Sequence, residues 1–350
     1  MTKVAILTLT SAGIQLAKEL REKWNQEIPI FVSEDKLEEE VRLFPTGRFR
    51  TGIQVLFKQY DALICIMATG IVVRSIAEVL EDKRKDPAIV VIDEKGRHTI
   101  SLLSGHIGGG NQLTLEISAK LNSCPVITTA TDVQNVTALD LLSKEINGWY
   151  ADFKETTKKV NRLLAEHQAV GLIQRENWVS DLRGLSLLQE NDSFNNYETV
   201  LLISDQQNEL DSEKIIQIVP RRYVLGIGAK KGIDFSVIKE EYLTFCQSVN
   251  IHFRSIKKVA SIDIKEQEVG ICQLAKWLEV PFETYSTAEL LTVSEKYPQS
   301  AFVKKVTGVG SVCLGAADLA SNGKVVTERY ANRGVTFALG KDEDDTCYTL

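Results

Sequence analysis

The chain has 350 residues, of which 44% are hydrophobic and 25% charged, and its formal net charge is −6. These proportions are typical of a globular protein, and the length predicts two or three domains of roughly 100–150 residues each. The negative charge argues against a dedicated nucleic-acid-binding protein, because it offers no overall attraction for a phosphate backbone. No apolar run approaches the roughly 18–20 residues of a membrane-spanning helix, so we expect no membrane association.

The N-terminal sequence MTKVAILTL is typical of a first strand rather than of a signal peptide, because no cleavage site follows a long apolar region. The six cysteines are scattered without C-x-x-C spacing. This pattern favours reduced thiols over a zinc site or a disulfide framework, so we expect a cytoplasmic protein.

The first 134 residues are predicted to form one α/β domain with a mainly parallel sheet and helical crossovers. It opens with strands at residues 3–9 and 28–32 and a helix at about 11–24 between them. Residues 61–133 continue the pattern, because helical segments alternate there with three apolar runs, at 62–67, 88–92 and 125–128. Ligands gather beyond the carboxyl ends of parallel strands, so we expect the glycine-bearing turns at 69–70 and 105–110 to share one edge of the sheet.

Two further α/β units are predicted, at residues 135–219 and 220–350. The middle unit combines a polar helical segment with two apolar strand candidates, at 170–173 and 199–203, and carries no chemical motif. In the last unit, strands are predicted at 223–227, 281–285, 324–327 and 335–339, and helices at 235–247 and 265–278.

The sequence SGHIGGGNQLT holds the densest glycine cluster of the chain. Glycines let a backbone approach a ligand closely, and backbone N–H groups at the following helix start can bind an anion. His106 is the candidate catalytic residue, because an imidazole suits proton transfer near neutral pH. Two alternatives stay open, namely that the loop is only a tight turn and that His106 serves in binding. The substrate-binding candidates of this loop are Gly105, Gly108, Gly109, Gly110 and Asn111.

The turn MATGIVVR contributes three more substrate-binding candidates, Thr69, Gly70 and Arg74. Thr69 and Gly70 stand at a predicted helix start, and Arg74, one turn inside, could bind a substrate carboxylate through two parallel hydrogen bonds. A surface arginine with solvent or an ion-pair partner is the alternative. Residues 93–96 separate two extended runs and are predicted to form a hairpin turn.

Two glycine-bearing segments of the last unit are further candidates for binding. GIGAKKG departs from the nucleotide motif G-x-G-x-x-G at Lys231, but its lysines and glycine backbone make a turn that can receive an anion. TGVGSVC precedes a helix rich in small residues, and close helix packing is its alternative explanation. No metal site is predicted, since the histidines lack ligand spacing. The candidates of these segments are Gly226, Gly228, Lys230, Lys231, Gly308, Gly310 and Ser311.

These motifs resemble those of the CbiG family, the cobalt-precorrin-5A hydrolases of anaerobic cobalamin biosynthesis. ICIMATGIVVRSIA and VVIDEKGRHTISLLSGHIGGGNQLT are similar to the N-terminal region of the family. YVLGIGAKKGI and FVKKVTGVGSVCLGAADLAS are similar to its C-terminal domain, which resembles CobE of the aerobic pathway. The middle segment matches in position and size. Family members often carry a cysteine and arginines where this chain has Ala229, Lys230 and Lys231, so positive charge is kept there and a thiol is not.

The resemblance implies hydrolytic opening of the δ-lactone that joins the ring A acetate of cobalt-precorrin-5A to the neighbouring meso carbon. That carbon would then leave with its methyl group as acetaldehyde, giving cobalt-precorrin-5B. No cofactor is expected, since cobalt would enter only as part of the substrate. Expected partners are this substrate and, transiently, neighbouring enzymes of the cobalamin pathway, with a homodimer left open. The alternatives are a non-catalytic corrinoid carrier and an enzyme with a nucleotide or methyl-donor cofactor, against which the broken G-x-G-x-x-G argues.

Overall fold

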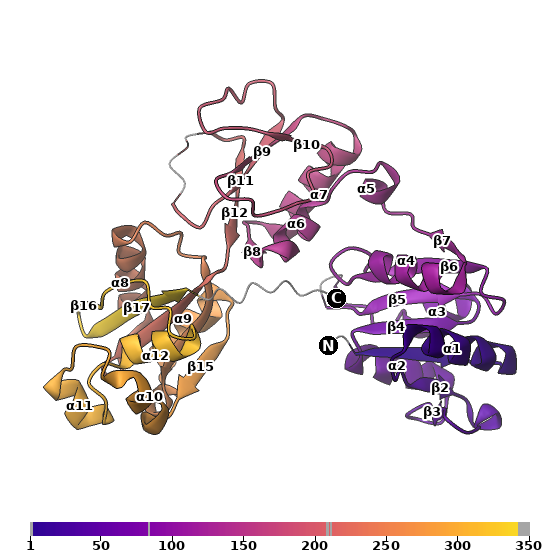
Figure 1. Ribbon diagram of the computed structural model, residues 1–350, viewed down its shortest axis with the longest axis horizontal. Helices are drawn as coiled ribbons and strands as arrows, with labels where there is room; N and C mark the ends of the chain where they lie inside the picture. The colour runs from indigo at the N-terminus through magenta and orange to yellow at the C-terminus, as the bar shows by residue number, and fades with distance from the viewer. Residues whose placement is uncertain (1–2, 83–84, 208–209, 211, 342–350) are drawn as a thin grey trace. The chain divides into compact units, whose positions relative to one another are not determined.

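The structure is a computed structural model, and it describes residues 3–82, 85–207, 210 and 212–341. Three β-sheets with helices beside them make up this part of the chain, so the predicted α/β class is confirmed (Figure 1). The chain divides into two compact units, with the boundary between Leu141 and Leu142. The proposed limits 1–134, 135–219 and 220–350 stay a prediction. No helix among the described residues is both long and apolar enough to cross a bilayer.

The first sheet has seven strands in the order β3-β2-β1-β4-β5-β6-β7. Its strands are β1 (Val4–Thr8), β2 (Ile30–Val32), β3 (Arg42–Leu43), β4 (Ala62–Ile66), β5 (Ala88–Ile92), β6 (His98–Leu103) and β7 (Cys124–Val126). The helices of this unit are α1 (Ser11–Trp24), the 3-10 helix η1 (Glu34–Lys36), α2 (Phe49–Gln59), α3 (Thr69–Ile76), α4 (Gly110–Leu121) and α5 (Ala130–Val133). Helix α6 (Leu139–Glu145) spans the boundary between the two units.

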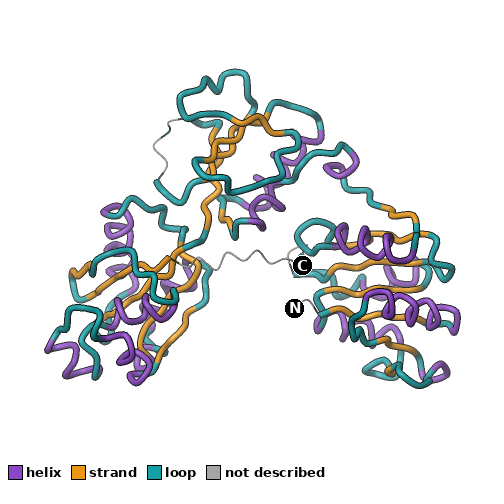
Figure 2. The backbone as a smooth tube through the Cα atoms, viewed as in Figure 1, coloured by secondary structure: helices purple, strands orange, loops and turns teal. Residues whose placement is uncertain are grey.

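Helices cover both faces of this sheet, and this explains why β4 is apolar and buried at every position (Figure 2). Successive side chains of a strand point to opposite faces. Leu63 and Cys65 pack with α2 and α3, whereas Ile64 and Ile66 pack with α1 and α4. A strand that is covered on both sides therefore shows a continuous apolar run instead of alternation.

A hairpin reverses the chain inside this sheet. Strands β1 to β5 are parallel, but β6 runs antiparallel to β5, with Ile89 opposite Leu103 and Ile92 opposite Thr99. The Asp93 carboxylate stabilises the turn by accepting hydrogen bonds from the backbone N–H groups of Lys95, Arg97 and His98. The hairpin predicted at residues 93–96 is thus confirmed.

This reversal makes the expected shared edge of the two glycine turns wrong. The turn at Gly70 follows the carboxyl end of β4, whereas the loop at residues 105–110 follows the end of β6, which lies beside the start of β5. The two turns stand at opposite edges, separated by the five residues of β5, or roughly 16 Å at about 3.3 Å per residue. Strand β7 runs parallel to β6, so the segment after β7 lies at the same edge as the 105–110 loop.

The second sheet has the strand order β10-β9-β11-β12-β8. Its strands are β8 (Gly148–Trp149), β9 (Val170–Gln174), β10 (Leu185–Leu187), β11 (Thr199–Ile203) and β12 (Ile215–Pro220), with α7 (Phe153–Ala165) beside them. The strands predicted at 170–173 and 199–203 are confirmed as β9 and β11. All neighbours in this sheet are parallel except β8, which pairs antiparallel with β12.

The third sheet has the strand order β15-β14-β13-β17-β16. Its strands are β13 (Tyr223–Ala229), β14 (Ile256–Ile262), β15 (Phe282–Tyr285), β16 (Tyr330–Asn332) and β17 (Val335–Lys341). The helices are α8 (Phe235–Ser248), the 3-10 helix η2 (Asp263–Lys265), α9 (Val269–Leu278), α10 (Thr287–Ser294), α11 (Ala301–Thr307) and α12 (Val312–Ala320). Strands β13, β14 and β15 are parallel to one another, and β17 pairs antiparallel with β13 on one side and with β16 on the other.

Three of the four strands predicted in the last unit are present, as β13, β15 and β17. The fourth, at 324–327, is wrong, because only Val325 forms an isolated bridge there, to Gly340. The predicted helix at 265–278 begins four residues later, at Val269, after the 3-10 turn η2.

Candidate functional site

The glycine loop between β6 and α4 turns sharply, and its glycines have packing reasons. Gly109 precedes α4 in the left-handed region, with φ +81. A Cβ atom on Gly108 would lie 2.5 Å from the Ser104 side chain, and one on Gly110 would lie 2.8 Å from the Leu103 carbonyl oxygen. The backbone N–H groups of Gly110 and Asn111 donate within the loop, to the carbonyl oxygens of Ser104 and Gly105.

His106 lies between two carboxylates and is only 15% exposed. Its Nε2 atom is 3.0 Å from Oδ2 of Asp132, on α5, and 3.0 Å from Oγ1 of Thr131. Its Nδ1 atom is 3.6 Å from Oδ2 of Asp140, whose own side chain is 2% exposed. Both ring nitrogens therefore face a carboxylate, and a doubly protonated imidazolium can satisfy both.

Asn111 holds Asp132 in place from the first turn of α4. Its Nδ2 atom donates to Oδ2 of Asp132 at 2.9 Å and to Oγ1 of Thr129 at 2.9 Å. Its Oδ1 atom accepts a hydrogen bond from the Ser101 hydroxyl at 2.7 Å, and the Asn111 side chain is buried. A buried amide with satisfied partners fixes the carboxylate that faces the histidine. We call His106, Asp132, Asp140 and Asn111 the histidine cluster.

The surroundings of His106 raise its pKa. The hydrogen bond and charge of Asp140 contribute most, Asp132 adds to them, and burial acts in the opposite direction. The protonated form is therefore favoured at a pH where an ordinary histidine would have lost its proton. The cluster can donate a proton to a developing alkoxide and recover it from water, as acid–base catalysis requires.

The other N-terminal candidates are not part of this cluster. Thr69 begins α3, and the guanidinium of Arg74 lies over Gly70, where a Cβ atom would be 3.4 Å from both terminal nitrogens. These residues stand at the opposite edge of the sheet.

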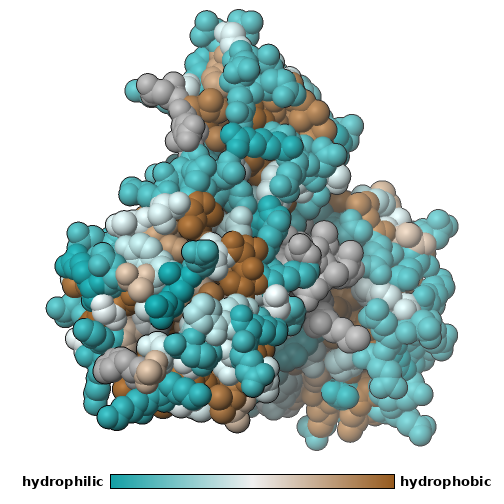
Figure 3. All heavy atoms as spheres, turned by 60° about the vertical axis from the view of Figure 1, so that its left-hand side comes forward, coloured by the Kyte–Doolittle hydropathy of each residue, from teal (hydrophilic) through white to brown (hydrophobic). Residues whose placement is uncertain are grey.

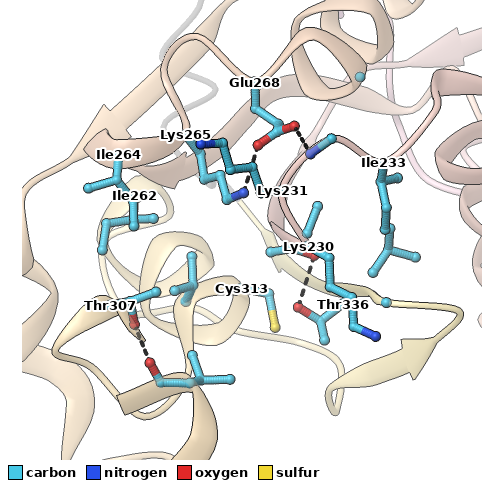
Figure 4. A pocket seen from close by; sticks show the side chains of 18 of the residues that line it. Lys230, Lys231, Ile233, Ile262, Ile264, Lys265, Glu268, Thr307, Cys313 and Thr336 are labelled. Carbon is cyan, nitrogen blue, oxygen red and sulfur yellow. Dashed lines mark hydrogen bonds and ion pairs between the residues drawn. The ribbon is translucent and has the colours of Figure 1, made fainter. Parts of the chain in front are cut away.

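A large cavity lies beside the third sheet, where β13 and β14 end (Figure 4). Its volume is about 1160 Å³. Four predicted binding residues line it: Gly228, Lys230, Lys231 and Ser311.

The three remaining glycine candidates do not line this cavity, and each has a structural role. A Cβ atom on Gly226 would lie 2.0 Å from the Cys313 carbonyl oxygen, so this glycine lets α12 pack on β13. Gly308 ends α11 with φ +80, and a Cβ atom on Gly310 would lie 2.0 Å from the Gln299 side chain.

Several residues of the histidine cluster and of the cavity beside the third sheet were not predicted from the sequence. The partners of His106 are Thr131 and Asp132, from the run TTATD, and Asp140. Threonines and an aspartate directly after a short apolar run were the sequence signal that could have indicated the first two. The cavity gains Lys265, Arg329 and Arg333, which lie far from the GIGAKKG turn in sequence.

The sequence matches three family models in succession along the chain. They are described as cobalamin synthesis G N-terminal, matching residues 51–132, cobalamin biosynthesis central region, matching 137–220, and cobalamin synthesis G C-terminus, matching 223–340. The chain therefore belongs to the cobalamin synthesis G (CbiG) family, and the resemblance seen in its motifs is confirmed.

Two curated relatives cover almost the entire chain. The cobalt-precorrin-5A hydrolase of Salmonella typhimurium is 37% identical over 346 residues, covering 96% of this chain and 97% of the relative. The protein of the same name from Priestia megaterium is 30% identical over 356 residues, covering 96% and 94%. The crystal structure of CobE, a protein from the cobalamin biosynthetic pathway, covers 35% of this chain and 92% of its own at 24% identity, with a TM-score of 0.33. That score is too low for an argument, so the likeness of residues 220–350 to CobE stays an expectation.

Proposed function

We propose that this protein opens the δ-lactone of cobalt-precorrin-5A by hydrolysis and releases the attached two-carbon unit as acetaldehyde, giving cobalt-precorrin-5B. Support for the substrate comes from the names of its relatives, which match almost from end to end. The observation that carries the chemistry is the position of His106 between Asp132 and Asp140. His106 and Asp132 lie in the region matched by the N-terminal family model, and Asp140 lies in the region matched by the central one.

The reaction needs one proton to leave the attacking water and one to reach the macrocycle. The macrocycle must also accept the electron pair of the carbon–carbon bond that breaks. Water adds to the lactone carbonyl and loses a proton, and the acyl C–O bond breaks to give a carboxylic acid and an alkoxide. The alkoxide electron pair forms the carbonyl bond of acetaldehyde while the carbon–carbon bond to the macrocycle breaks. The electron pair of that bond stays on the macrocycle, which takes up a proton. Atoms and charge balance with one water molecule, and no oxidant or added cofactor is required.

His106 can serve both proton movements. With its pKa raised by Asp140 and Asp132, the imidazolium can protonate a departing oxygen or the macrocycle, and the neutral ring then accepts a proton from water. Asn111 and Thr129 hold Asp132 so that this carboxylate stays beside the ring. Cobalt enters this proposal only as part of the substrate.

The test is incubation of the purified protein with cobalt-precorrin-5A while acetaldehyde is measured. We expect release that depends on the protein and needs no nucleotide, methyl donor or added metal. His106→Ala should reduce turnover by about 10²–10⁴-fold, because acid–base help acts in the transition state. Stoichiometric binding without turnover would favour a corrinoid carrier, and a strict need for a soluble cofactor would refute the proposed reaction.

We further propose that the protein works in the cytoplasm, in transient contact with neighbouring enzymes of the pathway. The five cysteines within the described residues, Cys65, Cys124, Cys246, Cys272 and Cys313, are free thiols, which suits a reducing compartment.

A further inference from the structure

The cavity of the C-terminal sheet combines size with an unusual local charge. Pockets for small ligands typically measure about 300–1,000 Å³, and this cavity, at about 1160 Å³, exceeds that range. Five cationic side chains line it against two carboxylates, Asp234 and Glu268, although the chain as a whole has a net charge of −6. The cations are Lys230, Lys231, Lys265, Arg329 and Arg333.

Three of these cations form no ion pair with a described carboxylate, although the charge of Lys231 also acts on Glu268. Lys265 is paired with Glu268 at 2.7 Å, and Arg333 is paired with Glu240 at 2.6 Å. No carboxylate within the described part of the chain forms an ion pair with Lys230, Lys231 or Arg329, and their side chains are exposed. An unpaired cation beside a cavity is available for a carboxylate of a bound molecule.

The walls between the cations are apolar and reach the solvent. Figure 3 shows hydrophobic side chains at the molecular surface among hydrophilic ones, and three of the most exposed line this cavity. They are Ile264 at 59% exposure, Val269 at 66% and Val306 at 63%. A ligand with an apolar surface that covers these exposed side chains removes them from water, which favours binding.

These features select against small anions and nucleotides. A phosphate or a short dicarboxylate would satisfy the cations but leave the apolar walls in water. A purely apolar ligand would cover the walls but leave the cations without counter-charge. A broad macrocycle with apolar faces and carboxylates on its rim meets both requirements.

We infer that this cavity binds a polycarboxylate tetrapyrrole, held through carboxylates at Lys230, Lys231 and Arg329 and through its ring faces at Ile264, Val269 and Val306. This assignment rests on the proposed function for the identity of the natural ligand, which would be the lactone substrate or its opened product. It assigns binding to the C-terminal sheet and proton transfer to the histidine cluster, in a different unit of the chain.

Equilibrium binding of uroporphyrin, a stable polycarboxylate tetrapyrrole, tests the assignment on the full-length protein. Lys231→Ala and Arg329→Ala should each weaken binding about fivefold to tenfold, as expected for the loss of one charge-assisted hydrogen bond. Affinity should also fall as salt is added, because the contacts are near the surface. Lys276→Ala removes an exposed cation of α9 that does not line the cavity, and it should bind like the unaltered protein.

Val269→Asp tests the apolar wall without endangering the fold. Position 269 is the first residue of α9, where an acidic side chain favours the helix, so the variant should remain folded. Its carboxylate would repel the ligand rim, and binding should weaken at least tenfold. Unchanged uroporphyrin affinity in all three cavity variants, or full competition by citrate at equal concentration, would overturn the assignment.

His106→Ala separates this inference from the proposed reaction. It should bind uroporphyrin with unchanged affinity while losing acetaldehyde release. If the unaltered protein releases no acetaldehyde but binding still depends on Lys231 and Arg329, the reaction fails and the cavity assignment stands. If acetaldehyde is released and the cavity variants bind and turn over normally, the cavity assignment fails and the reaction stands.

Discussion

Nδ1 of His106 lies 3.6 Å from Oδ2 of Asp140, a carboxylate with a side chain 2% exposed. A carboxylate in that position stabilises the protonated ring, and it is the largest contribution to the raised pKa of His106. The imidazolium in turn stabilises the buried carboxylate, because a nearby opposite charge offsets part of the cost of burying a charge. Asp140 therefore favours the protonated form of His106.

Asp140→Asn should move the pH profile of acetaldehyde release. The substitution keeps the shape of the side chain but removes the charge that raises the pKa of His106, so that pKa should fall. The alkaline limb of the profile, which reports loss of the imidazolium, should shift to lower pH. Glu116→Gln on the exposed face of α4 is the matched control and should leave the profile in place. An unchanged alkaline limb in Asp140→Asn would show that His106 does not set it.

The same pair predicts a stability effect of definite sign. Because the folded pKa of His106 is raised above its unfolded value, the stabilisation is complete below about pH 6.5 and is lost as pH rises through the folded pKa. Asp140→Asn should flatten this dependence, which denaturant titrations at several pH values would measure.

Asn111→Ala should lower turnover with little effect on KM. Asn111 touches Asp132 and Thr129 and is a positioning residue for the carboxylate that faces His106. We expect a loss of about 10- to 100-fold in kcat, because small displacements of catalytic groups strongly reduce the rate of the chemical step. Gln112→Ala, at the next and exposed position of α4, is the control. A fall in stability with kcat unchanged would reduce Asn111 to a structural role.

Gly226→Ala should destabilise the C-terminal sheet. Its new Cβ atom would stand 2.0 Å from the backbone oxygen of Cys313, so β13 and α12 would have to separate. Overpacking of this kind costs roughly 1–3 kcal/mol of unfolding free energy or more. Gly315→Ala, inside α12, meets only the ends of two side chains, Leu290 at 3.2 Å and Val293 at 3.8 Å, and should be nearly neutral. Equal unfolding midpoints for the two variants would contradict the packing argument.

His252 predicts a loss of stability in acid. Burial, helped by the nearby Arg254 charge, lowers its pKa to about 4. A histidine that is neutral when folded stabilises fully above its unfolded pKa of about 6.5, and stability falls as pH decreases from there toward 4. The loss is at most about 3.5 kcal/mol, from roughly 1.4 kcal/mol for each of the 2.5 pKa units between 6.5 and 4. His252→Gln should remove this slope in denaturant titrations between pH 4 and 7, and an unaltered slope would assign it to other groups.

The sequence revealed most strands because apolar runs between turn residues leave a local signal. It did not reveal β14, where Lys257 and Lys258 interrupt the apolar run IKKVASI. Lys258 is tolerated because its ammonium pairs with Glu283 of the neighbouring β15 at 3.0 Å. That partner exists only once the sheet has formed, so the strand could not be recognised from its own residues.

The residues of the candidate sites were likewise predicted only in part. His106 and its glycines form one contiguous motif, but Asp140 reaches the ring only through the path of the chain after β7. The hairpin at residues 93–96 was predicted, yet its consequence for Gly70 and Arg74 was missed. A single antiparallel strand moves the loop that follows it to the opposite edge of the sheet. Predicting each strand separately does not reveal that change.

The histidine cluster is built from residues close together in the chain. Its members and the side chains that hold them all fall within residues 101–140, and the widest pair, His106 and Asp140, is 34 positions apart (140 − 106). Short separations keep the entropy cost of loop closure low relative to longer loops, since each doubling of the loop adds about 0.6 kcal/mol. During synthesis, which proceeds from the N-terminus, Asp140 is made 88 positions before Gly228, the first residue that lines the cationic cavity (228 − 140). The surroundings that charge His106 can thus be assembled before the first residue of the cationic cavity has been made.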